Sequence, residues 1–279
     1  MKKAIAIVVL FSIIVAVAIA NTCGRSIKCV AVKEGIYEDK YEFKGIYLFD
    51  EDVTYEGQVD ETYLYADNGQ KVSCNSEIAK GITCNKAGMM YLGLDGYEGC
   101  YTLNNVDEIS LKDIDNVINV RELKGGIKII DNSTWYIYML LNKDIVDFVK
   151  KGSSIKLIIG EKYYPAVIDK LYDKDEGTFA RVHIETDPDI TDLRRGVTGY
   201  IIKSSYEGII VPSSAISHSN EKDGVYINFN GYTAFRKVQV LYSGDEISVV
   251  TAESGKGKLS RYDSVVKKAE GIKSGMKIK

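Results

Sequence analysis

Residues 41–49 read YEFKGIYLF, and this stretch indicates the fold class of the chain. Tyr41 and Phe43 alternate with Glu42 and Lys44, and a period of two is typical of a β-strand with one buried face. Similar runs follow along the chain, which holds 20 tyrosines and only 3 prolines in 279 residues. Aromatic and β-branched residues favour strands. The chain is therefore predicted to be mainly β.

Further strands, a turn and two helices are predicted on the C-terminal side of this strand. Further strands are expected at 62–66, 89–94, 128–141, 154–160, 163–172, 178–185, 196–203, 208–211, 224–228, 234–241 and 246–250. Asp67-Asn68-Gly69 after the 62–66 run is a hairpin-type turn sequence. Two short helices are expected at 110–118 and 142–150, because each begins with a capping residue and spaces its apolar residues three and four apart. The later strands are spaced as in a small barrel or sandwich.

An unbroken apolar run at residues 4–20, AIAIVVLFSIIVAVAIA, follows Met1-Lys2-Lys3. A helix of roughly 17 to 20 residues spans a hydrocarbon core of about 30 Å. Lysines before such a run favour a cytoplasmic N-terminus, so the rest of the chain is predicted to be extracytoplasmic. Ala18-Ile19-Ala20 also fits the cleavage site of a signal peptide. A retained single-pass anchor at 1–24 is favoured, and in both cases the bulk of the chain is exported.

Charge and cysteine content narrow the classes of partner. The formal net charge is −3 and the lysines are scattered among carboxylates, so nucleic acid is not expected as a partner.

The five cysteines are Cys23, Cys29, Cys74, Cys84 and Cys100, and an odd number excludes a complete internal disulfide framework. A Cys74–Cys84 or Cys84–Cys100 bridge fits an oxidising compartment, and free thiols in partly buried strands are the alternative. No spacing suggests a metal site.

Four stretches carry a resemblance to a known family. They are 56–59 (EGQV) with 67–72 (DNGQKV) and 78–79; 87–98 (AGMMYLGLDGYE); 126–137 (GIKIIDNSTWYI) with 150–157 (KKGSSIKL); and 208–216 (GIIVPSSAI) with 224–227 and 235–240. In this order, behind an N-terminal anchor, the chain resembles the periplasmic adaptor, or membrane fusion, proteins of the HlyD type that accompany export pumps.

The resemblance implies a nested fold. It places a membrane anchor at 1–24, outgoing strands at 30–50, a lipoyl-like barrel-sandwich module at 51–105, a helical linker at 106–123, a β-barrel domain at 124–205 and a membrane-proximal β domain at 206–279. It also implies a homo-oligomer packed around an inner-membrane transporter, acting by contact without chemistry.

The chain departs from the family pattern between the two lipoyl-like halves. Many family members insert a long α-helical hairpin there, which reaches an outer-membrane partner. Here only the seven residues 80–86, KGITCNK, separate the halves. Seven residues cannot form a helical hairpin, so a role close to the membrane is expected.

Residues that would suggest chemistry are few. Lys86 lies near the position of the modified lysine in true lipoyl domains, but a solvated lysine at a hairpin tip is the preferred interpretation. His183 is interpreted as a strand residue, and His218 as part of a loop or turn. Asp187-Pro188-Asp189 is interpreted as a turn rather than a calcium site. Residues 254–258, SGKGK, lack the spacing of a phosphate-binding loop.

No catalytic, cofactor-binding or metal-ligating residue is therefore assigned, no cofactor is expected, and the protein is predicted not to be an enzyme. The predicted function is a membrane-anchored extracytoplasmic adaptor of an export complex. The alternative is an exported structural or binding module of cell-envelope assembly without a pump partner. A secreted hydrolase is a third hypothesis, and it would require a pocket with clustered titratable groups.

Overall fold

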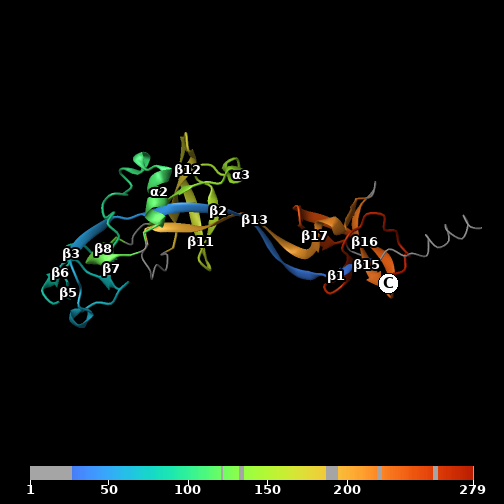
Figure 1. Ribbon diagram of the computed structural model, residues 1–279, viewed down its shortest axis with the longest axis horizontal. Coiled ribbons are helices and arrows are strands. Elements are labelled where there is room, and N and C mark those ends of the chain that lie inside the picture. The colour runs from blue at the N-terminus through green and yellow to red at the C-terminus, as the bar shows by residue number, and fades with distance from the viewer. Residues whose placement is uncertain are drawn as a thin grey trace, which may run out of the picture. The chain divides into compact units, whose positions relative to one another are not determined.

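The computed structural model describes residues 27–120, 122–131, 135–186, 194–218, 222–253 and 257–278. The predicted mainly-β class is confirmed: strands make up most of the described chain and the helices are short (Figure 1). The predicted anchor at 1–24 lies outside the described residues. Within the described ranges, no helix has the length and apolar character that crossing a membrane requires.

The chain forms two compact units. Unit 1 contains residues up to Tyr37 and residues from Ser205 onward, whereas unit 2 is Glu38–Ser204. The long strands β2 (Lys33–Leu48) and β13 (Gly196–Pro212) each contribute residues to both units. Unit 2 is thus inserted into unit 1, and the chain enters and leaves it within a strand.

Unit 2 contains a barrel whose strands follow the order β2-β9-β12-β11-β10-β13. The strands not yet bounded are β9 (Trp135–Leu140), β10 (Ser154–Ile159), β11 (Lys162–Lys174) and β12 (Gly177–Ile184). β13 also pairs with β2, and Tyr47 N–H donates to Arg195 O at the start of β13 (2.9 Å). The sheet therefore closes on itself, which removes its exposed edges.

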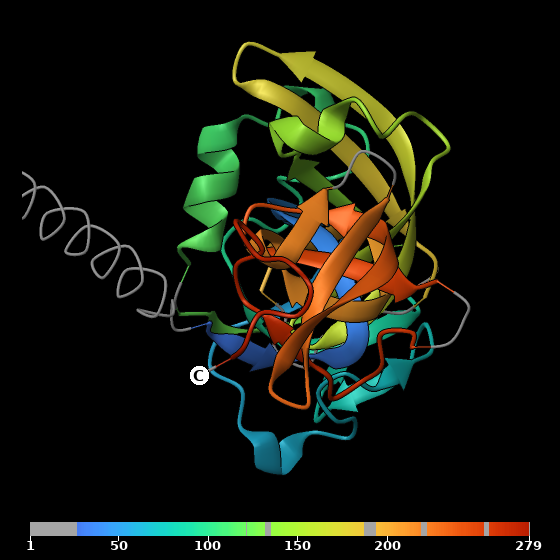
Figure 2. The same ribbon diagram turned by 90° about the vertical axis from the view of Figure 1, so that its right-hand side faces the viewer.

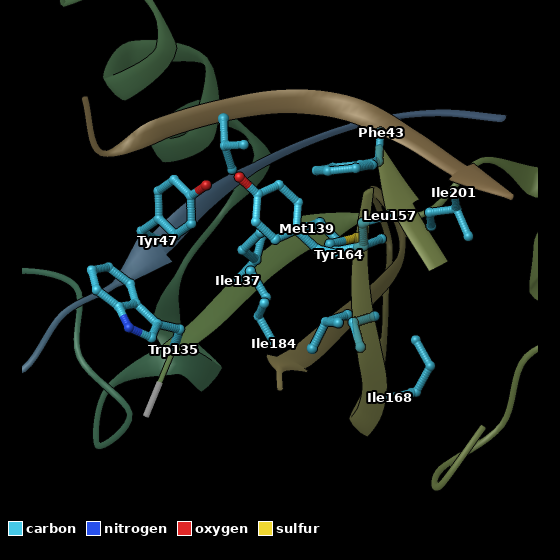
Figure 3. Close-up of a cluster of buried hydrophobic side chains, with 14 of the residues drawn as sticks. Phe43, Tyr47, Trp135, Ile137, Met139, Leu157, Tyr164, Ile168, Ile184 and Ile201 are labelled. Carbon is cyan, nitrogen blue, oxygen red and sulfur yellow. The ribbon is translucent and has the colours of Figure 1, made fainter. Parts of the chain in front are cut away.

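Side chains that face the barrel interior form its core. Figure 3 shows this cluster, with Trp135 beside Tyr47 and with aliphatic side chains from facing strands in the centre. Trp135 packs edge-on against Tyr47 and Phe49. Ile137 and Leu157 are completely buried. The alternation seen at residues 41–49 reflects this arrangement, since Phe43 and Tyr47 both point into the cluster.

A second, smaller sheet in unit 2 has the strand order β3-β8-β7-β4. Its strands are β3 (Glu51–Glu56), β4 (Lys71–Val72), β7 (Gly88–Leu94) and β8 (Lys124–Ile130). Between β4 and β7 the chain forms a separate hairpin of β5 (Glu77–Ala79) and β6 (Ile82–Thr83). Lys71 pairs with Met89, so the segments around these residues do meet as neighbouring strands. β8 lies in the segment expected to begin the barrel domain, but it pairs with β7 and β3 and belongs to the small sheet.

The central strands of the small sheet are buried on both faces. Met90 and Ile129 pack in the core of the small module, whereas their neighbours Tyr91 and Ile130 pack in the barrel core. Successive side chains of a strand point to opposite faces, so one strand can serve two cores. The small sheet and the barrel are therefore packed directly on each other within unit 2.

The short helices follow the predicted capping signals. α2 (Leu111–Ile118) has Ser110 and Asp113 in a capping box, and α3 (Lys143–Val146) has Asn142 as its N-cap. The first predicted helix is confirmed, and the second ends earlier than expected. One-turn 3₁₀ helices occur at η1 (Glu61–Tyr63), η2 (Val106–Glu108) and η3 (Ser213–Ala215).

Unit 1 is a separate β structure with the strand order β1-β18-β15-β16-β17-β13, and β14 pairs with β15. Its other strands are β1 (Cys29–Ala31), β14 (Ile216–His218), β15 (Asp223–Phe229), β16 (Tyr232–Ser243), β17 (Ile247–Ala252) and β18 (Ser264–Val266). A core of its own contains Val225, Val250 and Val265, all completely buried. The first and the last strands, β1 and β18, are neighbours.

Four predicted strands need correction. The 62–66 strand is wrong: Asp60 Oδ1 accepts from Thr62 N–H (3.0 Å) and caps η1, and only Leu64 forms an isolated bridge. The 128–141 run is two strands, β8 and β9, in different sheets. The runs at 196–203 and 208–211 are instead parts of one long strand, β13.

Replacing Ile137 by alanine tests the barrel core. Because Ile137 is completely buried, Ile137→Ala should lower the free energy of unfolding of unit 2 by about 2–5 kcal/mol. Urea unfolding of the full chain in detergent, followed by the fluorescence of Trp135, the only tryptophan, measures this. Ile36→Ala, at a side chain that is 64% exposed, is the control and should change the midpoint little. Equal effects of the two substitutions would contradict the assigned core.

Candidate functional site

The most unusual feature of unit 2 is a cluster of buried charges where the small sheet meets the barrel. We call it the ionic junction, and its members are Glu51, Asp95, Glu98, Lys128 and Arg195. The side chains of Lys128, Arg195, Glu51 and Asp95 are at most 2% exposed, and that of Glu98 is 13% exposed. Charged side chains are seldom buried to this degree unless they are paired.

The two cations bridge the three carboxylates. Lys128 Nζ lies 3.1 Å from Glu51, 3.2 Å from Asp95 and 3.1 Å from Glu98. Arg195 contacts Glu51 through Nη2 (2.5 Å) and donates from Nε to Asp95 Oδ2 (3.2 Å). Glu51 and Asp95 are thus each shared between both cations, which links the group into one network.

Local structure explains how each charge is held in place. Lys128 lies on β8 between Ile127 and Ile129, and its side chain points to the barrel face of the small sheet. The turn after β7 supplies both Asp95 and Glu98. In this turn Glu98 accepts from Asp95 N–H (2.6 Å) and Gly96 N–H (2.9 Å). The carboxylates are therefore oriented by backbone donors as well as by the cations.

Aromatic packing covers the junction on one side. The Arg195 guanidinium lies 5.0 Å from the ring centroid of Phe49, and Lys128 Nζ lies 5.9 Å from the same centroid. Phe49 in turn packs edge-on against Trp135 of the barrel core. The rings exclude water from the ions, which strengthens each electrostatic contact.

The protein environment holds the charged forms in place. Burial by itself raises the pKa of Asp95, but the positive charges of Arg195 and Lys128 and the N–H of Tyr97 outweigh it, so the net pKa lies below its ordinary value. Burial likewise opposes the charge of Arg195, yet Glu51 and Asp95 raise its pKa above the usual value. Asp95 and Arg195 therefore remain ionised as a pair.

This arrangement can position segments, because four separate parts of the chain meet in it: β3, the turn after β7, β8 and the residue before β13. β3 and β8 belong to the small sheet, and Arg195 immediately precedes β13, the strand that returns to unit 1. A buried charge fixes geometry because any displacement leaves it unpaired in a low-dielectric interior. We interpret the junction as a lock that sets the small sheet against the barrel.

The sequence alone did not identify the ionic junction. One signal was available: Lys128 interrupts the apolar run Gly126-Ile127-Lys128-Ile129-Ile130 at the start of a predicted strand. The carboxylates gave no such signal, because Glu51 and Asp95 lie in acidic, turn-like sequences that resemble solvated loops. Their partner Arg195 is 144 residues away from Glu51 in the chain.

The structure corrects the interpretation of Lys86. The tip of the β5–β6 hairpin is the turn at Lys80-Gly81, and Lys86 lies between β6 and β7. Lys86 Nζ pairs with Asp50 Oδ2 (2.6 Å), and its side chain is 27% exposed. It is therefore a half-buried, paired lysine and not a solvated tip lysine.

The two histidines lie in different units. His183 is in β12, as predicted, with its ring 5.0 Å from that of Tyr136. His218 was predicted in a loop or turn, but it ends strand β14, where Nδ1 lies 2.8 Å from Asp223 Oδ1. The strand forms because Ser217 and His218 pair with Gly224 and Asp223 of β15.

The four described cysteines, Cys29, Cys74, Cys84 and Cys100, are free thiols. Cys84 is completely buried and its Sγ donates to Ser73 O (3.0 Å), whereas Cys74 and Cys100 are exposed. These four residues are thus free thiols, but only Cys29 lies in a strand, so the expected placement in partly buried strands holds for Cys29 alone. Cys23 lies outside the described residues.

The two remaining sequence motifs lie wholly or partly outside the described residues. The 187–189 turn lies outside the described residues, as do residues 254–256 of the SGKGK stretch. In the described part of the chain, no group of three or more His, Cys, Asp and Glu side chains is arranged to hold a metal ion.

Comparison with known proteins gives matches only among solved structures. No protein-family model matches the chain. No curated protein matches it in sequence. ZneB from Cupriavidus metallidurans is 14% identical, with 89% of this chain and 94% of that chain covered and a TM-score of 0.30.

Two further structures show the same range of similarity. MacA from Actinobacillus actinomycetemcomitans is 16% identical over 85% of this chain and 98% of its own, with a TM-score of 0.38. The membrane fusion protein Spr0693 from Streptococcus pneumoniae R6 is 10% identical over 57% of this chain and 98% of its own, with a TM-score of 0.29. The class that the sequence resembles is thus represented among the matched structures.

Removing the Arg195 guanidinium tests the lock. Arg195→Met should lower the free energy of unfolding of unit 2 by about 3–5 kcal/mol, because Glu51 and Asp95 then remain buried with Lys128 as their one remaining cationic partner in the ionic junction. Arg181→Met is the matched control: Arg181 pairs with Asp169 at a partly exposed site, and its loss should cost less than about 1 kcal/mol. The free energy of unfolding of each variant is measured by urea unfolding, followed by the fluorescence of Trp135. Similar costs for the two variants would show that the ionic junction is not a lock.

Acid should weaken the ionic junction. A carboxyl whose pKa is lowered by folding adds stability that is complete above its unfolded pKa of about 3.9 and is lost as the pH falls through the lower folded value. The urea concentration at which unit 2 is half unfolded should therefore decrease as the pH is lowered below about 4. This decrease should be less steep in Asp95→Asn than in the unsubstituted chain. Asp115→Asn, at an exposed pair with Lys44, should keep the original slope. An unchanged slope in Asp95→Asn would contradict this assignment.

Proposed function

We propose that the protein is a membrane-anchored, extracytoplasmic adaptor subunit of an export complex that acts by protein–protein contact. The observation that carries the proposal is the path of the chain. It runs from unit 1 through β2 into unit 2, forms the small sheet, and returns through the barrel strands and β13 to unit 1. This nested order is what the family resemblance implies.

The path suits a spacer because unit 2 contains neither chain end. It is joined to unit 1 at two points, between Tyr37 and Glu38 and between Ser204 and Ser205, and both fall inside strands. Strands resist extension and bending better than loops, so force or position can pass along them. In this proposal the small sheet with its β5–β6 hairpin is the lipoyl-like module, β9 to β13 form most of the barrel domain, and unit 1 is the membrane-proximal domain.

The small module supports a short form of adaptor. Between β5 and β6 the chain turns at Lys80-Gly81, and Gly81 has the positive φ (+73°) that such a tight turn needs. A helical hairpin at this point is therefore replaced by a turn. Contacts with a transporter would be made by the barrel and by unit 1, where Phe148 (62% exposed) and Phe229 (56%) offer apolar surface.

The interior of unit 2 also favours a structural role. The buried titratable groups at the ionic junction are paired with one another, and Phe49 covers two of them. A catalytic acid or base needs access to a substrate. We therefore propose contact and positioning as the mechanism, with no chemical step. The second candidate is an exported structural or binding module of envelope assembly, to which the same rigid unit is suited.

Site-specific photocrosslinking in intact membranes separates these two functions. A photoreactive amino acid replaces Phe148 in one variant and Phe229 in another, each with a C-terminal tag for recovery. An adaptor should yield crosslinks to an integral-membrane transporter subunit, identified by mass spectrometry. Control variants carry the crosslinker at the exposed Lys151 and Lys237, one in each unit.

The outcome decides between the candidates. Transporter crosslinks from the phenylalanine positions, and fewer from the lysine positions, would support the adaptor and identify its pump. Self-crosslinks alone, or crosslinks to wall-assembly proteins, would instead support the envelope module and leave export without support.

A further inference from the structure

Unit 1 contains a cavity of about 750 Å³ at the point where the described chain begins. Its lining includes Ile27 and Lys28 from the first described residues, and Val266, Lys267, Glu270 and Ile272 from the C-terminal segment. Figure 2 shows the C-terminal segment, in red, running against the strands of unit 1. The cavity therefore brings together the beginning and the end of the folded chain.

Backbone hydrogen bonds tie the walls of this cavity together. Lys267 N–H donates to Lys28 O (2.8 Å), and the Ser214 hydroxyl donates to Lys267 O (2.7 Å). Ala269 N–H donates to Ser214 O (2.8 Å). Three segments that are distant in sequence are thus fixed around one space, so the cavity is formed without a ligand.

The cavity combines an apolar floor with positive charge. Ile27 and Val266 are buried, whereas Lys28 and Lys267 are exposed at its rim. In the described part of the chain, Lys268 pairs with Glu270 (2.7 Å), while Lys28 and Lys267 have no carboxylate partner. Such a site fits an anionic group joined to an apolar body.

Positive charge is concentrated in the C-terminal segment of the chain. From Ser264 to the last residue the chain has five lysines and one glutamate, although its overall formal charge is −3. Lysines close to a membrane surface are attracted to anionic lipids wherever the leaflet that they face contains them.

Sequence position also places the cavity at the membrane. The predicted anchor ends at Gly24, three residues before Ile27. An extended chain advances at most about 3.6 Å per residue, so Ile27 lies within about 11 Å of the end of the span. The headgroup layer is roughly 5–7 Å thick on each side of the hydrocarbon core. The cavity is therefore within reach of lipid headgroups.

We propose that this cavity binds the phosphate-bearing headgroup of an anionic phospholipid. Lys28 and Lys267 hold the phosphate, and the apolar floor contacts the glycerol and the first methylene groups. This inference rests on the membrane anchoring in the proposed function, but it does not require a transporter. Such a site would set the height and orientation of unit 1 on the bilayer.

Photolabelling of the full-length chain in lipid nanodiscs tests the proposal. The nanodiscs contain phosphatidylglycerol or phosphatidylcholine with a photoreactive group near the glycerol, and mass spectrometry maps the labelled peptides. Phosphatidylglycerol should label residues 27–28 and 264–272 preferentially. In the double variant Lys28→Gln/Lys267→Gln this labelling should fall by about 25-fold, at about 5-fold for each lysine. Lys237→Gln/Lys258→Gln, with the same change of charge in unit 1, should retain it.

Every other result overturns the proposal. Equal labelling by the two lipids, or an equal loss in the two double variants, would show only unspecific attraction to the surface. Competition by inorganic phosphate would identify a small-anion site instead. A chain that inserts into nanodiscs without labelling the cavity would refute this inference alone, whereas a chain that does not insert would refute the anchoring in the proposed function as well. The comparison of lipids uses the unsubstituted chain, so it does not depend on the folding of a variant.

Discussion

Unit 2 depends on the pairing of two buried cations with three carboxylates where its two sheets meet. Lys128 and Arg195 are removed from water, and each ion would cost several kcal/mol if it were left unpaired there. Only one relative position of the small sheet and the barrel satisfies all the contacts at once. Hydrophobic packing could tolerate small shifts between the sheets, but the ionic junction does not.

The path of the chain gives this constraint its functional meaning. Arg195 immediately precedes β13, and β13 continues into unit 1. The position of the small sheet is thus coupled to the strand that leaves unit 2. For an adaptor that acts by contact, such coupling would keep the distal module in a defined place.

Both faces of the central strands contribute to the same result. β7 and β8 place alternate residues into two cores, so that Met90 stabilises the small module while Tyr91 stabilises the barrel. A single residue of register shift would exchange these faces and bring Lys128 into the apolar core of the small module. The strand register and the ionic junction therefore support each other.

The sequence by itself determined the mainly-β class, the two capped helices, most of the strands and an apolar run long enough to anchor the chain. These features depend on local periodicity and on capping residues, which are read within a few neighbouring positions. The tertiary structure decided what local signals cannot show. It assigned β8 to the small sheet, placed a capped 3₁₀ helix at Glu61–Tyr63 where a strand over 62–66 was expected, and paired Lys86 with Asp50. It also brought Arg195 to Glu51 across 144 positions of sequence, because strand partners and buried ion pairs depend on contacts between distant segments.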